Sequence, residues 1–331
     1  MELSSPHPAA PASRWTGRTD GTGPQHRRWH QAVHLQEELA TASQYVPQEP
    51  REGIAVVGFC SDEGVRRNHG RPGAASGPAA LRNALGPLAL HEDFSVLDAG
   101  DITVDGDDLE GGQRRLGAAT TELLNQHSLT IVLGGGHETA YGSYLGMAGS
   151  HRVAEEQRVG ILNLDAHFDL RDAPQPTSGT PFRQIAESEH NAGRPFRYAV
   201  VGISRPNNTR ALFDTAAELG VDHLLDEQCA THTGQVSEFV EKFLAQIDVL
   251  HLSIDLDVLP AAVAPGVSAP AGLGVPLDVI HAICHQVASS GKLALMDVVE
   301  LNPTYDIDNR TARTAARLIT TVAHTAAEHH R

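Results

Sequence analysis

The sequence has few cysteines, no long apolar run and a shortage of positive charge. Its 331 residues include three cysteines, Cys60, Cys229 and Cys284, which lie far apart and form no CxxC motif. An odd number of scattered cysteines is typical of a reducing compartment and excludes a zinc cluster built from cysteine thiolates. No stretch approaches the ~18 consecutive apolar residues of a membrane-spanning helix, and the N-terminus has no apolar signal-peptide core. We therefore expect a cytoplasmic protein without a membrane partner.

The charge balance and two missing glycine motifs exclude further classes. The formal net charge is −16, which argues against a surface that binds nucleic acid or an anionic membrane. The segment GIAVVGFCSDEG at 53–64 lacks GxGxxG, and GGGHE at 134–138 lacks the GK[ST] of a phosphate-binding loop. The sequence therefore gives no support to a dinucleotide-binding fold or to a P-loop.

Regularly spaced apolar runs predict the fold. Residues 1–13, rich in Pro, Ser and Ala, are expected to be disordered, whereas residues 14–331 are expected to form one α/β domain. Helical patterns separate most of the runs, as in 276–291, where Pro276 begins the helix. Strands that are apolar throughout predict a parallel sheet covered on both faces, either open and doubly wound or closed into a barrel. The eight expected strands are 53–60, 95–101, 129–134, 159–165, 197–204, 221–226, 248–255 and 292–299.

Side chains of the kind that bind metals follow four of these runs. Taken singly, each has an ordinary explanation as a hydrogen-bond donor, a cap or the start of a loop. Because the carboxyl ends of parallel strands meet at one edge of the sheet, we expect them to converge, and so many buried carboxylates would repel one another without a cation. The residues are His137 after TIVLGGG, Asp165, His167 and Asp169 after VGILNL, Asp255 and Asp257 after VLHLSI, and Glu300 after LALMDVV.

The composition of this cluster indicates the metal and the chemistry. Without Glu300 it contains four carboxylates and two imidazoles but no sulfur, a set that favours Mn²⁺ or Mg²⁺ over structural zinc. Six side chains are too many for one tetrahedral ion, so two ions that share aspartates are expected. Such a pair lowers the pKa of a bound water and favours hydrolysis at an electron-poor carbon or phosphorus. The sequence shows no phosphate-binding nest beside this cluster, which argues against a phosphoesterase.

Five motifs in order resemble those of a known family. GGGHE, NLDAHFD, SGTPF, SIDLDVLP and VELNP are similar to the arginase–agmatinase ureohydrolases over roughly residues 14 to 325. The segments WTGRTDG, GFCSDEGVRRNHGRPGAASGP, NLDAHFDLR and GISRPNNT resemble more narrowly the formimidoylglutamases of that family. This resemblance implies an open three-layer α/β/α fold with a mostly parallel eight-stranded sheet, two Mn²⁺ ions and a homo-oligomer. The implied reaction is hydrolysis of N-formimidoyl-L-glutamate to glutamate and formamide in histidine breakdown.

The resemblance also implies a role for each residue of the cluster. His137 and Asp169 would bind one ion, His167 and Asp257 the other, and Asp165 and Asp255 would bridge. Glu300 would hold the cationic amidine nitrogens of the substrate. A hydroxide bound to the metals would attack the formimidoyl carbon, and the nitrogen of glutamate would leave after proton transfer.

One departure from the arginase and agmatinase patterns bears on the substrate. Those enzymes carry a histidine near the SG and GT positions, whereas the segment TSGTPF has Ser178 and Phe182 and no histidine. The leaving-group proton is therefore expected to travel through Asp169. The absence of this histidine argues against assignment as an arginase or agmatinase and agrees with assignment as a formimidoylglutamase.

The charge of the expected substrate is a second discriminator, because formimidoylglutamate carries two carboxylates and agmatine none. Arginine forks suit bidentate carboxylate binding, although any one arginine could instead offset surface acids. The residues expected to bind substrate are Arg66, Arg71, Arg183, Arg205 and Asn208. Two alternatives remain, another hydrolase of amidino or guanidino acids and a non-catalytic metal-binding relative. The presence of every expected ligand argues against the second.

Overall fold

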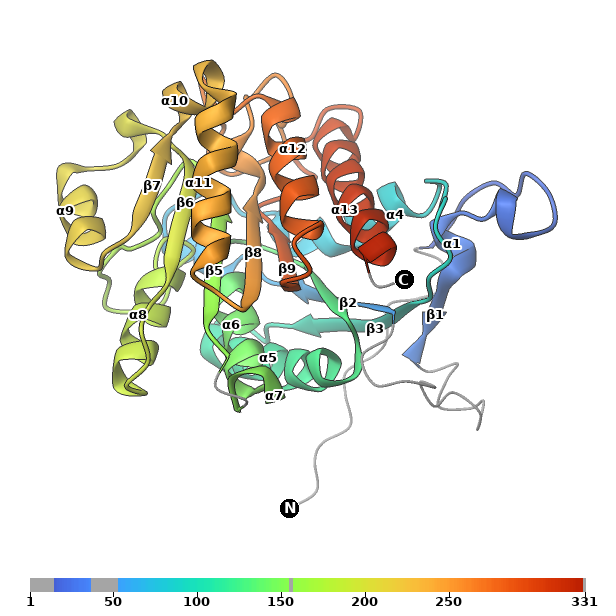
Figure 1. Cartoon of the computed structure of the whole chain (residues 1–331), viewed down its shortest axis with the longest axis horizontal. Helices are drawn as coiled ribbons and strands as arrows, with labels where there is room; N and C mark the ends of the chain where they lie inside the picture. The colour runs from blue at the N-terminus through green and yellow to red at the C-terminus, as the bar shows by residue number, and fades with distance from the viewer. Residues whose placement is uncertain (1–14, 37–52, 155–156, 330–331) are drawn as a thin grey trace.

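A single parallel sheet forms the centre of the molecule (Figure 1). The computed structural model describes residues 15–36, 53–154 and 157–329, so the expected disorder of residues 1–13 lies outside the described part. The strands are all parallel and follow the order β1-β3-β2-β4-β9-β8-β5-β6-β7. They are β1 (Val33–Leu35), β2 (Ile54–Cys60), β3 (Val96–Thr103), β4 (Leu129–Leu133), β5 (Val159–Leu164), β6 (Tyr198–Ile203), β7 (Asp222–Leu225), β8 (Val249–Asp255) and β9 (Leu293–Val299).

The predicted α/β architecture is confirmed, with one addition. Each of the eight expected strands is present, and the sheet is open, with β1 and β7 at its two edges. The ninth strand, β1, was not predicted; its three residues pair with the start of β3, Val33 beside Val96. A three-residue strand shows no hydrophobic period, so it cannot be separated from the helical pattern of its neighbours.

Helices cover both faces of the sheet because the strands are apolar on both sides. In β2, Ile54 and Val56 face one core, whereas Ala55, Val57 and Phe59 face the other. The first core packs against α4, α11, α12 and α13, and the opposite face packs against α5, α6, α8 and α9 (Figure 1). The helices are α1 (Trp29–Ala32), α3 (Glu63–Arg67), α4 (Gly77–Leu85), α5 (Leu109–Gln126), α6 (Thr139–Gly149), α7 (His151–Ala154), α8 (Pro181–Asn191), α9 (Arg210–Glu218), α10 (Asp226–Thr231), α11 (Thr233–Ala245), α12 (Leu277–Ala288) and α13 (Arg310–His329).

The predicted helix at 276–291 illustrates how the apolar pattern positions these elements. The observed helix α12 begins after its N-cap, Pro276, whose missing N–H would have no partner in the first turn. Its buried side chains include Ile280, Ile283, Cys284 and Val287, the stripe expected from the sequence. In the described part of the chain, no helix combines the length and apolar character needed to cross a membrane.

Candidate metal centre

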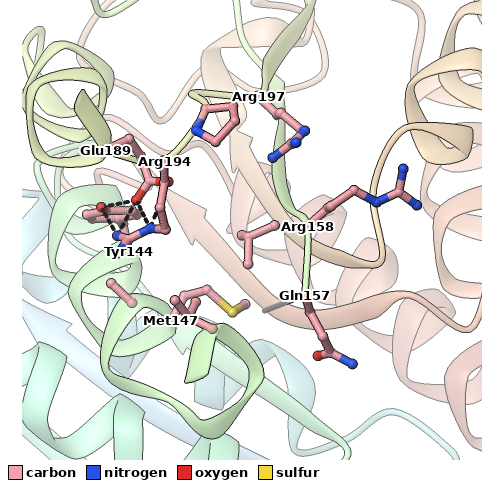
Figure 2. A pocket seen from close by; sticks show the side chains of 11 residues that line it. Tyr144, Met147, Gln157, Arg158, Glu189, Arg194 and Arg197 are labelled. Atoms are coloured by element: carbon pink, nitrogen blue, oxygen red, sulfur yellow. Dashed lines mark hydrogen bonds and ion pairs between the residues drawn. The ribbon is translucent and has the colours of Figure 1, made fainter. Parts of the chain in front are cut away.

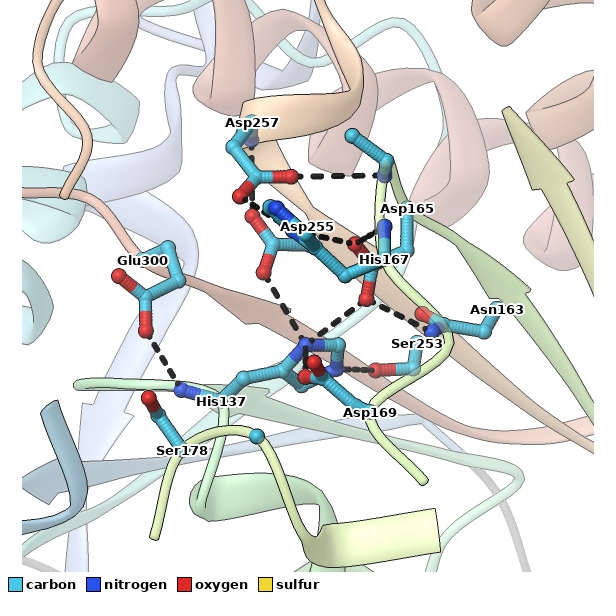
Figure 3. A network of polar contacts seen from close by, with 12 residues as sticks. His137, Asn163, Asp165, His167, Asp169, Ser178, Ser253, Asp255, Asp257 and Glu300 are labelled. Atoms are coloured by element: carbon cyan, nitrogen blue, oxygen red, sulfur yellow. Dashed lines mark hydrogen bonds and ion pairs between the residues drawn. The ribbon is translucent and has the colours of Figure 1, made fainter. Parts of the chain in front are cut away.

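Four adjacent strands deliver the predicted cluster to one edge of the sheet. Strands β4, β9, β8 and β5 are neighbours in that order, although β8 and β9 come last in the sequence. Their carboxyl ends are level, since Leu133 pairs with Val298, Asp255 with Val299, and Leu164 with Ile254. The side chains at these ends or just after them therefore lie close together, and they are His137, Asp165, His167, Asp169, Asp255, Asp257 and Glu300 (Figure 3).

The glycine turn after β4 brings His137 over this edge. Gly135 lies between the ends of β2 and β9, where its carbonyl accepts a hydrogen bond of 2.8 Å from the backbone N–H of Glu300. A Cβ at Gly135 would lie 1.8 Å from the carbonyl oxygen of Ser61. Only glycine permits this close approach, so the turn can pass between two strand ends and place the next side chains in the cluster.

His137 faces three carboxylates with one ring nitrogen. Its Nδ1 lies 3.1 Å from Asp165 Oδ2, 2.9 Å from Asp169 Oδ2 and 3.0 Å from Asp255 Oδ2 (Figure 3). This nitrogen is buried and has no hydrogen-bond partner of good geometry among the described residues. Phe182 packs edge-on against the ring, with centroids 5.3 Å apart, and helps to fix its plane.

A second group overlaps the first at Asp165. His167 Nδ1 lies 3.1 Å from Asp257 Oδ2 and 3.5 Å from Asp165 Oδ1. Asp165 therefore belongs to two groups of three residues, one with His137 and Asp169 and one with His167 and Asp257, each compact enough to hold a metal ion. Asp255 is outside both groups, but it touches His137 and lines the same cavity.

Backbone and side-chain amides hold these carboxylates in place. Asp165 Oδ1 accepts a hydrogen bond of 2.6 Å from the backbone N–H of His167, and its Oδ2 accepts one of 2.9 Å from Asn163 Nδ2. In the same way, Asp255 Oδ1 accepts a hydrogen bond of 2.8 Å from the backbone N–H of Asp257. These hydrogen bonds fix the orientation of the carboxylates, which is the arrangement expected of a binding site.

The electrostatics of the cluster fit a cation. Burial would lower the pKa of His137, but the carboxylates around its Nδ1 raise that pKa well above its ordinary value. Burial raises the pKa of Asp255, and the nearby carboxylates of Asp257 and Asp165 raise it further. The crowded carboxylates therefore favour protonation of His137 and of Asp255. A divalent cation would relieve the same repulsion between the carboxylates. The donor set of oxygen and imidazole nitrogen suits Mn²⁺.

Glu300 lies beside this cluster with one carboxylate oxygen unused. Its Oε1 accepts a hydrogen bond of 2.9 Å from the backbone N–H of His137, whereas its Oε2 is buried without a hydrogen-bond partner among the described residues. Burial, with a contribution from the carboxylate of Glu138, raises the pKa of Glu300 to about 8. Glu300 and Asp169 have positive φ angles, 67° and 49°, a conformation that is uncommon for non-glycine residues and that recurs at functional sites.

A cavity of about 330 Å³ opens onto these groups. Two arginines line it, Arg71 and Arg171, together with Asn68, His69 and Ser178. Arg71 is already engaged: its Nε donates to the carbonyl of Ser268 at 2.8 Å, its Nη2 donates to that of Val267, and its guanidinium lies 3.9 Å from the ring centroid of Tyr305. It joins three loops at the mouth of the cavity.

Arg171 was not among the predicted site residues. It is exposed, and its Nη1 donates to Asn68 Oδ1 at 3.2 Å. Its side chain crosses Gly179, where a Cβ would lie 2.9 Å from the Cδ of Arg171. The sequence did contain a signal, because Arg171 continues the every-second-residue row of Asp165, His167 and Asp169.

The other residues predicted to bind substrate lie outside this cavity. Arg66 binds Glu63 through Nε and Nη2, each at 2.6 Å, and its side chain is 61% exposed. Arg183 lines a neighbouring hollow together with Arg171 and pairs with Glu187 at 2.8 Å. Arg205 and Asn208 line a third hollow near Phe213 and His223. Their role in substrate binding stays a prediction.

Asn208 has a clear structural contact with the cluster segment. Its Oδ1 accepts a hydrogen bond of 3.1 Å from the backbone N–H of Phe168, and its Nδ2 donates to the carbonyls of Ala166 and Ser204, both at 2.9 Å. The side chain is buried, and these bonds use both ends of its amide. Asn208 therefore supports the backbone on either side of His167.

A second pocket, of about 260 Å³, lies at the opposite end of the strands (Figure 2). It is lined near the starts of β5 and β6 by Arg158 and Arg197. Its Glu189 is bound by Tyr144 and Arg194, with both contacts at 2.5 Å, and Arg158 pairs with Asp248 at 2.7 Å. This pocket lacks the crowded carboxylates of the first, so the candidate chemistry belongs to the carboxyl edge of the sheet.

Comparisons with known proteins identify the family of the chain. The sequence profile of the Arginase family matches residues 52–324. Formimidoylglutamase from Nocardia farcinica is 59% identical over 93% of this chain and 95% of its own length, and that from Rhodococcus jostii is 55% identical over 93% and 94%. The crystal structure of Trypanosoma cruzi formiminoglutamase with Mn²⁺₂ superposes with a TM-score of 0.75 at 26% identity, covering 86% of this chain and 97% of that one. Bacillus subtilis arginase gives a TM-score of 0.70 at 25% identity, covering 82% and 98%. The chain is therefore an enzyme of the arginase family, and within that family it belongs with the formimidoylglutamases.

Proposed function

We propose that this enzyme hydrolyses N-formimidoyl-L-glutamate to L-glutamate and formamide with the help of two Mn²⁺ ions. The observation that carries the proposal is the pair of His/Asp groups that share Asp165, with the unpaired oxygen of Glu300 in the same cavity. Its similarity to formimidoylglutamases supports the substrate, and the Mn²⁺₂ of the Trypanosoma cruzi structure supports the metal.

The proposed ligands combine the two overlapping groups with Asp255, whose role is the one that the family resemblance implies. His137 and Asp169 would hold one ion, His167 and Asp257 the other, and Asp165 and Asp255 would bridge them. When bound, a pair of divalent ions supplies a nucleophile near neutral pH, because it lowers the pKa of a water molecule. The cluster contains no sulfur ligand, the kind of donor that softer metals prefer.

The side chains of the enzyme would orient the substrate and move its proton. A substrate amidinium needs a carboxylate partner, and Glu300 Oε2 is buried in the cavity with no hydrogen-bond partner among the described residues. The leaving nitrogen of glutamate needs a proton, yet the segment TSGTPF offers no histidine to supply it. Asp169 lines the cavity, and burial together with the charge of Asp165 raises its pKa. It is the group we assign to carry that proton.

Substrate choice is tested by comparing amidines of different charge. Purified protein loaded with Mn²⁺ is expected to release formamide from formimidoylglutamate and to leave arginine and agmatine unchanged. Urea from arginine or agmatine would instead assign a guanidine hydrolase, and turnover of none of the three would support a non-catalytic relative.

Arg171→Met is expected to raise KM for formimidoylglutamate by roughly 10- to 100-fold, with a smaller change in kcat. Arg171 lines the cavity, and we propose that it binds a carboxylate of the substrate. Its replacement would remove one charge-assisted contact, worth about 1.5–3 kcal/mol. The measurement is steady-state kinetics of the Mn²⁺-loaded enzyme.

Two further arginine variants locate the carboxylate subsite. Arg158→Met removes a paired arginine at the far end of the sheet and should leave KM unchanged. Arg183→Met tests the neighbouring hollow. A larger rise in KM for Arg183→Met than for Arg171→Met would contradict our placement of the substrate carboxylate.

Three assignments depend on the family rather than on the site. We propose a cytoplasmic location, a role in histidine breakdown and a homo-oligomeric assembly. The formimidoylglutamases that it resembles support the second of these.

A further inference from the structure

A buried chain of hydrogen bonds leads from His137 away from the cavity. His137 Nε2 lies 3.0 Å from Ser253 Oγ, Ser253 Oγ donates to Asp297 Oδ1 at 2.5 Å, and Asp297 Oδ2 lies 2.6 Å from His251 Nε2. All four side chains are at most 1% exposed. Ser253 of β8 stands beside Asp297 of β9 in the sheet, and His251 lies two residues before Ser253 on the same face.

Asp297 sets the direction in which hydrogen bonds are donated along this row of side chains. Burial would raise the pKa of Asp297, but His251 and the hydroxyl of Ser253 lower it below the ordinary value. An ionised carboxylate can only accept hydrogen bonds, so the single hydrogen of Ser253 goes to Asp297. The Ser253 oxygen is then left to accept from His137 Nε2, which must carry a hydrogen.

This polarity decides which nitrogen of His137 can bind a cation. With hydrogen on Nε2, the lone pair of Nδ1 faces Asp165, Asp169 and Asp255. The other tautomer would place a hydrogen where the cation must sit. Partners of this kind, which bind a ligand residue rather than the metal itself, commonly set metal affinity.

We propose that Asp297 is a positioning residue that acts through Ser253 to keep His137 in the tautomer able to bind a cation, while His251 holds Asp297 in place. The inference rests on the proposed metal site and concerns the position that His137 faces. The ion position at His167 and Asp257 is not connected to this row of hydrogen bonds by the contacts given above. The hydrogen bonds from Asp297 to His137 should therefore affect metal affinity at only one of the two ion positions.

The test measures Mn²⁺ binding to Asp297→Asn by titration and by electron paramagnetic resonance. The asparagine amide can donate to Ser253 Oγ, which allows the serine hydroxyl to donate to His137 Nε2 and moves the hydrogen to Nδ1. We expect the affinity of one Mn²⁺ to fall by roughly 10- to 100-fold while the other changes little. At Mn²⁺ concentrations where the wild-type enzyme gives the spectrum of a coupled pair, the variant should give the six-line spectrum of an isolated ion.

Two other variants make the result specific. Ser253→Ala removes the acceptor and should give the same pattern, so it replaces Asp297→Asn if that variant does not fold. Ser143→Ala is the matched control, because the Ser143 hydroxyl is buried without a hydrogen-bond partner among the described residues; it should bind Mn²⁺ like the wild type. The thermal stability of each metal-free variant shows whether folding is preserved.

The outcomes separate this inference from the proposed function. Two wild-type-like Mn²⁺ affinities in Asp297→Asn and Ser253→Ala would overturn the inference alone. Equal weakening of both ions would also overturn it, because that result indicates a general loosening of the site. A wild-type enzyme that binds no Mn²⁺ would overturn the proposed function, and the inference with it.

Discussion

Asp165→Asn is expected to lower kcat by more than ~100-fold and to reduce bound Mn²⁺ at both positions, because loss of even an outer partner of a metal ligand costs 10- to 100-fold. Asp165 is the one side chain shared by both compact His/Asp groups of the described residues. Its Oδ2 faces His137 and its Oδ1 faces His167. Asparagine keeps the shape but offers only one oxygen and no charge. The measurements are kcat with formimidoylglutamate and the metal content of the purified protein.

The matched control for this substitution is Asp222→Asn. Asp222 is exposed at the start of β7, far along the sheet from the cluster, and its replacement removes the same charge. It should leave both rate and metal content unchanged. Full activity and full metal content in Asp165→Asn would contradict the two-ion proposal, and loss of one ion alone would show that Asp165 does not bridge.

Glu300→Gln is expected to reduce kcat/KM by roughly 10²- to 10³-fold, since removing one partner of a buried, hydrogen-bonded charge pair costs about 2–5 kcal/mol. Glutamine preserves the oxygen that accepts from the backbone N–H of His137. It replaces the unpaired oxygen with an amide N–H, which cannot accept from an amidinium. We therefore expect Mn²⁺ content close to that of the wild type while catalysis fails. Kinetics and metal analysis of the same preparation measure both quantities.

Two comparisons make the Glu300 result decisive. Glu241→Gln removes one carboxylate from the exposed face of α11 and should behave like the wild type. A Glu300→Gln enzyme that has lost its metals would assign Glu300 to metal binding. A Glu300→Gln enzyme with unchanged kcat/KM would remove Glu300 from our account of amidine recognition.

Most of the sheet could be predicted from the sequence because its strands are buried on both faces. A run such as IAVVGFC in β2 is apolar throughout and ends at polar residues, so it can be located without knowledge of its neighbours. The order of the strands could not be predicted in this way. Strands β8 and β9 insert between β4 and β5, and nothing local in the sequence encodes that insertion. The three-residue β1 was missed because it has too few residues to show a period.

The two parts of the site differed in how far sequence reasoning reached. The cluster residues follow strand ends, and the parallel sheet brings those ends to one edge, so their convergence could be expected before their distances were known. The arginines lie on loops and helix surfaces, where nearby acids determine their position. Arg66 pairs with Glu63 and Arg183 with Glu187, whereas Arg171 reaches the cavity because Gly179 leaves room for its side chain. Such contacts depend on packing between distant segments.

The identity of the products tests the central claim most directly. The claim is that water attacks the formimidoyl carbon while Glu300 holds the amidine and the glutamate nitrogen leaves. NMR of the Mn²⁺-loaded enzyme with formimidoylglutamate should show formamide and glutamate in equal amounts, with no release of ammonia and no turnover after metal removal. N-formylglutamate and ammonia, or full turnover in the metal-free enzyme, would contradict it.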